Sequence, residues 1–256
     1  MAAVAVGLLV SSSTHGFEVN SHRRRIRGLS RPLRVSLLTD FHLGPHLGVR
    51  ELEAWVEASN QQLPDLVLLG GDLVDQHYRG DLSELKLALS RLGSRLGVYA
   101  VLGNHDRTRY RNLSPLRLAL EEAGVDLLVN EGRSVRDDLY LAGLDDYRVG
   151  QANVGAALAR EPEGDAATVL LSHNPDVIPE LPGGIDLVLS GHTHGGQIRL
   201  PFLGPLVTSS EYGARFAEGW VRAQSPAFVS RGLGVTAIPV RFNCPAEVVV
   251  LDLEPA

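Results

Sequence analysis

Apolar runs of strand length alternate with amphipathic helical patterns through the first half of the chain. Residues 33–38, 65–69 and 97–102 are mainly apolar and are followed by polar loops, as expected for strands buried in a sheet. Residues 48–62 and 81–93 separate these runs and repeat apolar side chains three and four positions apart, which predicts amphipathic helices. This order of strand, helix and strand predicts βαβ units with neighbouring parallel strands.

Short apolar runs dominate the second half of the chain. A third helix is expected over residues 113–123, before this change. The strands expected after it cover residues 126–129, 138–144, 167–171, 185–189, 197–200, 227–230 and 248–253. Because helices predominate early and strands late, we expect one α/β domain in which two sheets pack together and helices lie outside them.

Composition narrows the classes of function and of metal site. The net charge of −6 argues against an extended nucleic-acid-binding surface. Cys244 is the only cysteine, which excludes an intrachain disulfide and a zinc site built from cysteines. A metal site in this chain must therefore use nitrogen and oxygen ligands.

The N-terminal segment, residues 1–32, differs in character from the expected domain at residues 33–256. Residues 1–10 are apolar but too few to span a bilayer, and residues 22–27 are mostly arginine. One interpretation is a frayed, flexible terminus. The other is a peripheral membrane anchor backed by basic residues. The expected location is accordingly the cytoplasm or the surface of a membrane.

Metal-competent polar side chains follow five of the expected strands. They lie in the segments Asp40-Phe41-His42, Gly70-Gly71-Asp72, Gly103-Asn104-His105-Asp106, Ser172-His173-Asn174 and Gly191-His192-Thr193-His194. Ligands of open α/β sheets bind beyond the carboxyl ends of the strands, so these segments are expected to converge. Asp40, Asp72 and Asn104 are each one βαβ unit apart, which places them side by side.

The residue types in these segments suit a divalent cation. Carboxylate, imidazole and amide oxygen together favour manganese, iron or zinc over calcium, which prefers oxygen ligands alone. Each segment by itself has a structural explanation, such as turn chemistry for Gly-Asp. Five such segments, all at strand ends, have no comparable structural explanation and together predict a metal site.

These segments resemble the pattern of the calcineurin-like metallophosphoesterase superfamily: Asp-x-His, Gly-Asp, Gly-Asn-His-Asp/Glu, a lone His and Gly-His-x-His. All five occur in that order over residues 40–194. Two later segments, residues 230–234 and 241–245, resemble a bacterial branch of the YkuE/YaeI type that is often tied to membranes. The resemblance implies a four-layer αββα sandwich of two mixed β-sheets flanked by helices.

The resemblance also implies two divalent metal ions, manganese, zinc or iron, and assigns their ligands by motif position. Asp72 would bridge the two ions. The remaining ligands would be Asp40, His42 and His194 for one ion, and Asn104, His173 and His192 for the other.

His105 takes the position of the family's catalytic histidine and is not expected to be a ligand. It would stabilise charge on the phosphoryl group or protonate the departing oxygen. Asp106 would either orient the His105 ring or cap the helix that follows. Two ions about 3.5–4 Å apart would raise the acidity of a shared water, and the resulting hydroxide would attack phosphorus in line.

The expected function is therefore hydrolysis of a phosphodiester or pyrophosphate in a small phosphate ester or a lipid-linked substrate. The alternative is a catalytically inactive binding scaffold of the same fold, and the intact ligand set and His105 weigh against it. A metal-dependent peptidase is a third hypothesis, but no His-Glu-x-x-His motif supports it.

Overall fold

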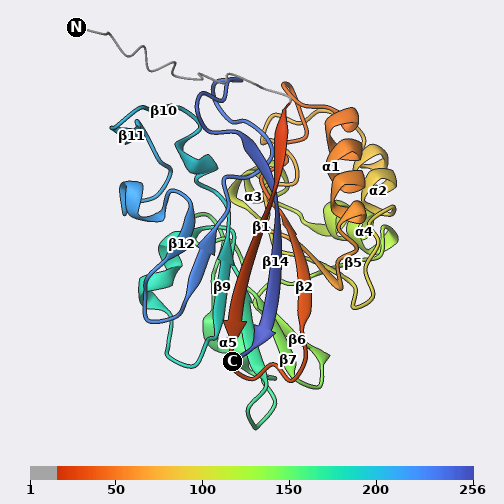
Figure 1. The fold of residues 1–256 in the computed structure, drawn as a ribbon. Helices are drawn as coiled ribbons and strands as arrows, with labels where there is room; N and C mark the ends of the chain where they lie inside the picture. Colours follow the sequence, from red (N-terminus) through yellow and green to blue (C-terminus); the bar gives the residue numbers. More distant parts are fainter. Residues whose placement is uncertain (1–15) are drawn as a thin grey trace, which may run out of the picture.

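Two six-stranded sheets pack against each other in the computed structural model, which describes residues 16–256 (Figure 1). The strands of the first sheet are β1 (Phe17–Ile26), β2 (Leu33–Leu38), β3 (Leu66–Leu69), β4 (Val98–Ala100), β5 (Val125–Leu127) and β14 (Ala246–Pro255). Those of the second are β6 (Glu131–Arg136), β7 (Leu139–Gly143), β8 (Ala167–Leu171), β9 (Leu187–Ser190), β12 (Gly219–Val221) and β13 (Ala227–Val229). A separate hairpin pairs β10 (Arg199–Leu200) with β11 (Gly204–Pro205).

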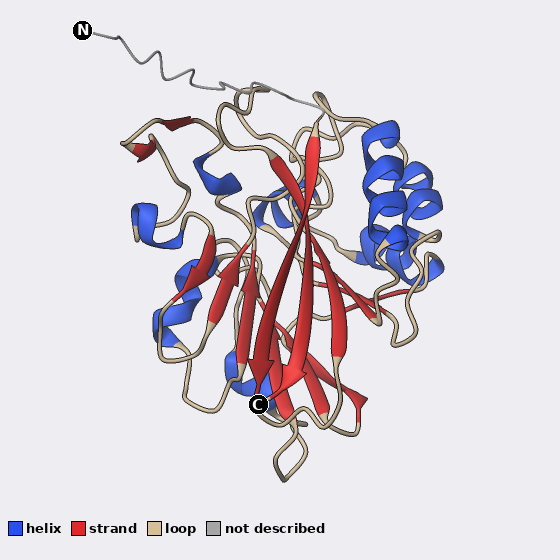
Figure 2. Ribbon diagram, viewed as in Figure 1, coloured by secondary structure: helices blue, strands red, loops and turns tan. Residues whose placement is uncertain are grey.

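Both sheets are mixed. The first has the order β1-β14-β2-β3-β4-β5, and β2 to β5 run parallel, as the βαβ pattern predicts. The second has the order β12-β13-β9-β8-β7-β6, with antiparallel pairs only at its two edges. The predicted arrangement of two mixed sheets flanked by helices is confirmed (Figure 2).

Helices cover the outer faces of both sheets. The α-helices are α1 (Val49–Gln61), α2 (Leu82–Leu89), α3 (Asn104–Arg109), α4 (Ser114–Glu122) and α5 (Val154–Leu158). The 3₁₀ helices are η1 (Pro175–Glu180), η2 (His194–Gly196) and η3 (Gly213–Phe216). Side chains of α1, α2 and α4 join one apolar cluster with the first sheet, and those of α5, η1 and η3 join another with the second.

Strand β3 is apolar throughout because both of its faces are buried. Leu66 and Leu68 contribute to the cluster between the two sheets, whereas Val67 and Leu69 contribute to the cluster under the helices. Alternate residues of a strand point to opposite faces. A continuous apolar run is therefore what a central strand of a four-layer sandwich requires.

Leu68→Ala should lower the free energy of unfolding by about 2–5 kcal/mol, because it leaves a cavity between two sheets that cannot close over it. The Leu68 side chain is fully buried. Urea unfolding followed by circular dichroism measures the change. Leu118→Ala is the control, since Leu118 is 54% exposed on α4 and should cost less than about 0.5 kcal/mol. Equal losses would contradict the packing of the sheets.

Part of the N-terminal segment belongs to the first sheet. Residues 17–26 form β1, which runs parallel to β14 from the pair Phe17–Ala246 to the pair Ile26–Pro255. The domain boundary expected at residue 33 therefore leaves out β1, a strand at the edge of the first sheet. Half of the side chains of β1 are exposed, and charged side chains on an edge strand discourage pairing with other chains.

The apolar run at residues 1–10 lies outside the described residues, so a membrane anchor there stays a prediction. Between residues 16 and 256, no helix has the length and apolar character that crossing a membrane requires.

Asp138 joins the loop after β1 to the turn between β6 and β7. Its carboxylate accepts hydrogen bonds from the Ser30 backbone N–H at 2.7 Å and from the Arg136 side chain. Burial alone would raise the pKa of Asp138, but the bonds from Arg136 and Ser30 outweigh burial and hold the pKa well below its usual range. The ionised carboxylate therefore stabilises the fold.

Asp138→Asn should lower the free energy of unfolding at pH 7 by about 1–2 kcal/mol. Because the folded pKa lies below the unfolded value near 4, the contribution is full above about pH 4 and is lost as the pH falls further. Urea unfolding of both proteins between pH 2.5 and 7 measures it. A difference that stays constant over this range would contradict the role of ionised Asp138.

Candidate metal centre

All seven predicted ligands lie together at one edge of the sandwich, in loops that follow β2, β3, β4, β8 and β9. The loops after β2 and β3 are joined by backbone hydrogen bonds from Asp40 N–H to Gly71 O at 2.9 Å and from His42 N–H to Asp72 O at 3.0 Å. The loop after β9 is joined to the loop after β2, because the His192 N–H donates to the Asp40 carboxylate at 3.0 Å. Convergence of these loops is as the strand order predicts.

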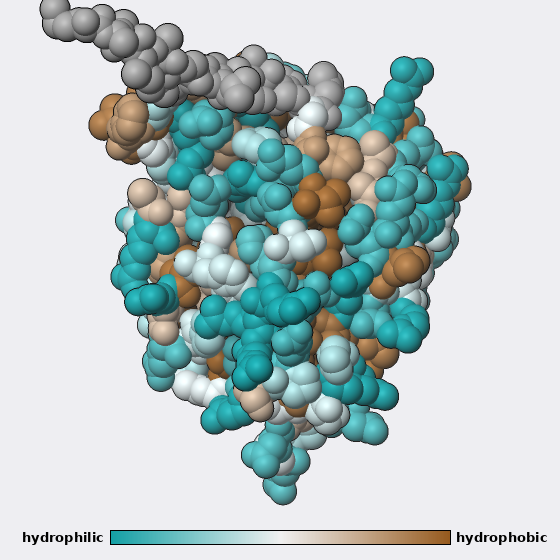
Figure 3. All heavy atoms as spheres, in the orientation of Figure 1, coloured by the Kyte–Doolittle hydropathy of each residue, from teal (hydrophilic) through white to brown (hydrophobic). Residues whose placement is uncertain are grey.

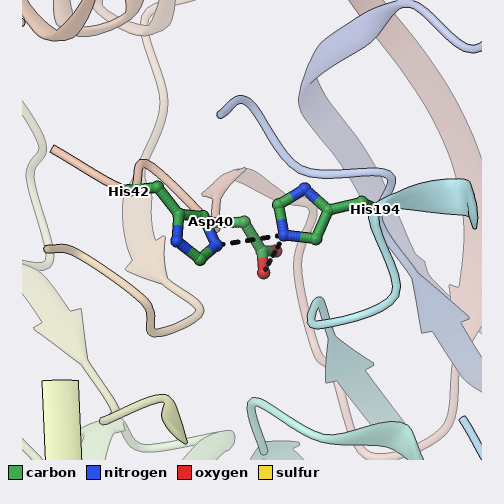
Figure 4. A group of neighbouring side chains, drawn as sticks. All are labelled: Asp40, His42 and His194. Atoms are coloured by element: carbon green, nitrogen blue, oxygen red, sulfur yellow. Dashed lines mark hydrogen bonds and ion pairs between the residues drawn. The ribbon is translucent and has the colours of Figure 1, made fainter. Parts of the chain in front are cut away.

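Asp40, His42 and His194 form one group of buried side chains whose polar atoms face one another (Figure 4). The Nε2 atoms of His42 and His194 are 3.0 Å apart, and His194 Nε2 is 3.5 Å from Asp40 Oδ1. Three donor atoms at this separation surround a space that one cation would suit.

Asp72, Asn104, His173 and His192 form a second group. His173 Nε2 is 3.2 Å from Asp72 Oδ2, from Asn104 Oδ1 and from His192 Nδ1. Asp72 Oδ2 also lies 3.4 Å from His42 Nε2. The Asp72 carboxylate thus stands between the two groups.

The backbone at the site is held in an uncommon conformation. Asp40, His42, Asp72, His192 and His194 all have positive φ, between 47° and 72°. Aspartate and histidine tolerate this left-handed region better than most side chains do, but still at some cost in conformational energy. The turns direct these side chains into one small volume, which an extended backbone would not do.

The charges of the site favour a cation. Burial raises the pKa of Asp40. Burial would lower the pKa of His173, but Asp72 outweighs burial and raises that pKa to about 10. The carboxylates of the site therefore favour a positive charge near them. Burial and the neighbouring His173 lower the pKa of His192 to about 3, which leaves a neutral ring with a free lone pair.

The hydrogen bonding of His173 also fits metal binding. Its Nδ1 is 2.8 Å from Gly70 O, and because a carbonyl only accepts, Nδ1 carries the proton. In the neutral ring that a bound cation would require, the lone pair lies on Nε2, which faces Asp72 and Asn104. A ligating histidine commonly donates its other N–H in this way. The donor set and its orientation therefore fit divalent cations, and the role of each side chain as a ligand stays a prediction.

His105 lies beside both groups, at the start of α3. Its backbone N–H donates to Asp72 Oδ1 at 2.8 Å, and Gly103 allows this approach because a side chain there would collide with the Asp72 carboxylate. The His105 ring meets the His42 ring edge-on, with centroids 4.4 Å apart. His105 Nδ1 is 3.2 Å from Asp75 Oδ2.

Asp75, not Asp106, is the carboxylate beside the His105 ring. Asp106 accepts hydrogen bonds from the backbone N–H groups of Gly103 and Val74, each at 3.0 Å. Of the two predicted alternatives for Asp106, the helix cap is the one that the structure supports. The position of Asp75, three residues after Asp72, is the signal that sequence reasoning missed.

Arg241 is a second residue whose position sequence reasoning missed. Its side chain is buried behind His194, with Nη2 3.3 Å from His194 Nδ1. The guanidinium also donates to the carbonyls of Arg231 at 2.8 Å and Gly234 at 2.7 Å. It thereby ties the loop that carries His194 to the loop after β13.

The sequence profile of the calcineurin-like phosphoesterase family matches residues 33–196, a range that includes every residue of the two groups. The chain belongs to the calcineurin-like phosphoesterase family. It is 29% identical to the uncharacterized metallophosphoesterase YkuE of Bacillus subtilis, over 98% of this chain and 94% of that protein. It is 30% identical to the phosphodiesterase YaeI of Escherichia coli, over 93% of this chain and 88% of that protein. These relatives confirm the YkuE/YaeI-type branch.

A likeness to a solved structure supports the fold. The NAD nucleotidase NadN of Haemophilus influenzae superimposes with a TM-score of 0.54 at 16% identity, over 79% of this chain and 45% of that one. The chain spans 61% of the length of two further bacterial relatives. Family membership and the clustered donor atoms identify this calcineurin-like phosphoesterase as a metal-dependent phosphoester hydrolase.

Proposed function

We propose that this phosphoesterase uses a dinuclear metal centre, with Asp72 as the ligand shared by two divalent ions. The observation that carries the proposal is the place of Asp72 Oδ2, 3.4 Å from His42 Nε2 in one group and 3.2 Å from His173 Nε2 in the other. Asp40 and His194 complete the first site, and Asn104 and His192 complete the second. Manganese, zinc or iron suits this mixture of carboxylate, imidazole and amide ligands.

Two such ions, when bound, supply a hydroxide nucleophile at neutral pH and neutralise charge on the phosphoryl oxygens. His105 is proposed as the catalytic residue of the chain itself. The Gln76 backbone N–H donates to His105 Nδ1 at 3.2 Å, and Asp75 Oδ2 lies 3.2 Å from the same atom, so Nε2 is left to face the substrate. From there, the ring donates a hydrogen bond to a phosphoryl oxygen or a proton to the departing oxygen.

The substrate class proposed is a phosphodiester or pyrophosphate, in a small molecule or linked to a lipid. The similarity to YaeI, a phosphodiesterase, supports the first of these two bond types. The net charge of −6 offers no broad basic surface for a nucleic acid.

Metal restoration of activity tests the proposal. The purified chain, stripped of metal and then given Mn²⁺ or Zn²⁺, should hydrolyse bis-p-nitrophenyl phosphate and bind two ions per chain. The stripped protein should be inactive, because no side chain replaces the nucleophile that the ions supply. Binding of metal without turnover of this ester or of p-nitrophenyl phosphate would favour the inactive scaffold, and one ion per chain at saturation would contradict the dinuclear centre.

A further inference from the structure

An apolar patch stands beside the metal centre, on the hairpin of β10 and β11 and on the loop after β13. Its exposed side chains are Phe202, Leu203, Leu206, Val207, Ile238 and Val240. Phe202 is fully exposed, and Leu203 and Val207 are about three-quarters exposed, at 77% and 74%. Figure 3 shows hydrophobic residues gathered at the upper left, where Figure 1 places β10 and β11. A cluster of this kind on a surface marks a binding site more often than chance exposure does.

The patch opens into a groove that reaches the metal centre. The groove has a volume of about 420 Å³. Leu206, Val207 and Ile238 line it together with Thr193 and His194. A group bound in this groove would lie beside His194, which is close enough for it to be a part of the substrate.

Two segments that line the groove are fixed to each other by one side chain. The Gln197 amide donates to the Val240 carbonyl at 3.0 Å, and its oxygen accepts the Thr236 N–H at 2.9 Å. Gln197 is buried and has a positive φ of 56°. The groove is therefore a preformed feature of the fold, as small-molecule sites usually are.

The scarcity of charged residues around the patch suits an apolar occupant. Arg199 is the only charged residue in the segment 197–209, and the segment 232–240 has none. Arg199 is already paired with Glu218 at 2.9 Å. The chain has 30 acidic residues, but these two segments contain none. An alkyl chain can therefore pack against them without removing a carboxylate from water.

We propose that the groove binds the alkyl chain of a lipid phosphoester and that the β10–β11 hairpin contacts the lipid surface from which this substrate comes. The proposal rests on the phosphoesterase function proposed above and names its substrate class. The phosphoester lies at the metal centre, the chain runs past His194 between Val207 and Ile238, and Phe202 and Leu203 enter the bilayer. Figure 1 shows the short β10–β11 hairpin at the upper left margin of the molecule, where its tip can reach a lipid surface.

A pair of chromogenic diesters tests the groove. In 4-nitrophenyl methyl phosphate and 4-nitrophenyl decyl phosphate, water adds to phosphorus, the bond to 4-nitrophenolate breaks, and the alkyl phosphate remains. Below the micellar concentration, kcat/KM should be about 50-fold higher for the decyl ester, the value of about three buried methylene groups. Val207→Asp combined with Ile238→Asp should bring the decyl-to-methyl ratio close to one.

Leu87→Asp combined with Leu118→Asp is the matched control. These residues are 57% and 54% exposed on α2 and α4, and this double variant adds the same charge while it should keep the 50-fold ratio. Hydrolysis of both esters at equal rates by the unchanged protein would overturn the groove and leave the phosphoesterase function standing. If neither ester is hydrolysed after metal restoration, the proposed function fails, and vesicle binding then decides the lipid contact.

Sedimentation of the full chain with phosphatidylcholine vesicles measures that contact without catalysis. Neutral vesicles minimise attraction through the basic residues 22–27. Phe202→Ser combined with Leu203→Ser should reduce the bound fraction about tenfold relative to Leu87→Ser combined with Leu118→Ser. Equal binding of the two double variants would overturn the proposal. The proposal would also be overturned if the unchanged protein does not bind vesicles and sedimentation velocity shows that the hairpin substitutions turn a dimer into a monomer.

Discussion

Asp72→Ala is expected to abolish metal binding and turnover together. The Asp72 carboxylate is buried between the two groups of donor atoms, and its other oxygen accepts the His105 N–H at 2.8 Å. Burial alone would raise its pKa, but His173 and His42 hold the pKa well below its usual range. Removing this anion leaves both groups without the charge that attracts a cation. We expect kcat/KM to fall at least about a thousandfold, or about 4 kcal/mol in activation free energy.

Metal content per chain, measured by mass spectrometry, separates this explanation from simple unfolding. Asp72→Asn keeps an oxygen for the His105 N–H and should also lose metal, since the charge is what the ions need. Asp137→Ala removes an exposed carboxylate from the turn between β6 and β7 and should retain full metal and activity. Two tightly bound ions in Asp72→Ala would contradict the bridging assignment.

His105→Ala is expected to lower kcat about 10²–10⁴-fold while both metal ions remain bound. The structure also offers the opposite interpretation, because His42, Asp72 and His105 lie close enough to hold a cation among themselves. Metal stoichiometry distinguishes the two. Loss of an ion together with activity would make His105 a ligand.

Asp75→Asn provides the companion measurement for His105. Asp75 is 3.2 Å from His105 Nδ1. Without its charge the His105 ring should be oriented less well, so kcat should fall while the metal content stays unchanged. Because His42 Nδ1 also lies 3.5 Å from Asp75, metal affinity has to be measured in this variant as well. Arg107→Gln is the control for disturbance of α3, the helix that carries His105. The Arg107 side chain is paired with Asp145 at 2.7 Å.

The central strands were predictable because strands buried on both faces consist of consecutive apolar residues. Strand β8 coincides with the expected residues 167–171, since both of its faces are covered and all but one of its positions, Thr168, are apolar. Strand β1 was not predicted. It alternates exposed and half-buried positions at the edge of the sheet and pairs with β14 more than 200 residues later. No local pattern reveals such a partner, and its arginines are typical of a solvated segment.

The residues of the site also differ in whether the local sequence predicts them. Asp40, Asp72 and His173 were predictable because each directly follows a predicted strand, where the sheet brings ligands together. Arg241 was not, because it reaches His194 from 47 residues away, in a loop without regular structure. Its role depends on carbonyl groups, and every residue has one, so residue type carries no signal.

The left-handed backbone at Asp40, His42, Asp72, His192 and His194 links the survival of the protein to its metal supply. Each such residue costs on the order of 1 kcal/mol, and the cost is concentrated in loops that bound ions would hold together. Ions that bind only the folded state repay it by mass action. Starved of metal, these loops should exchange amide hydrogens first and offer proteases an entry, so a cell short of metal would lose the enzyme along with its activity.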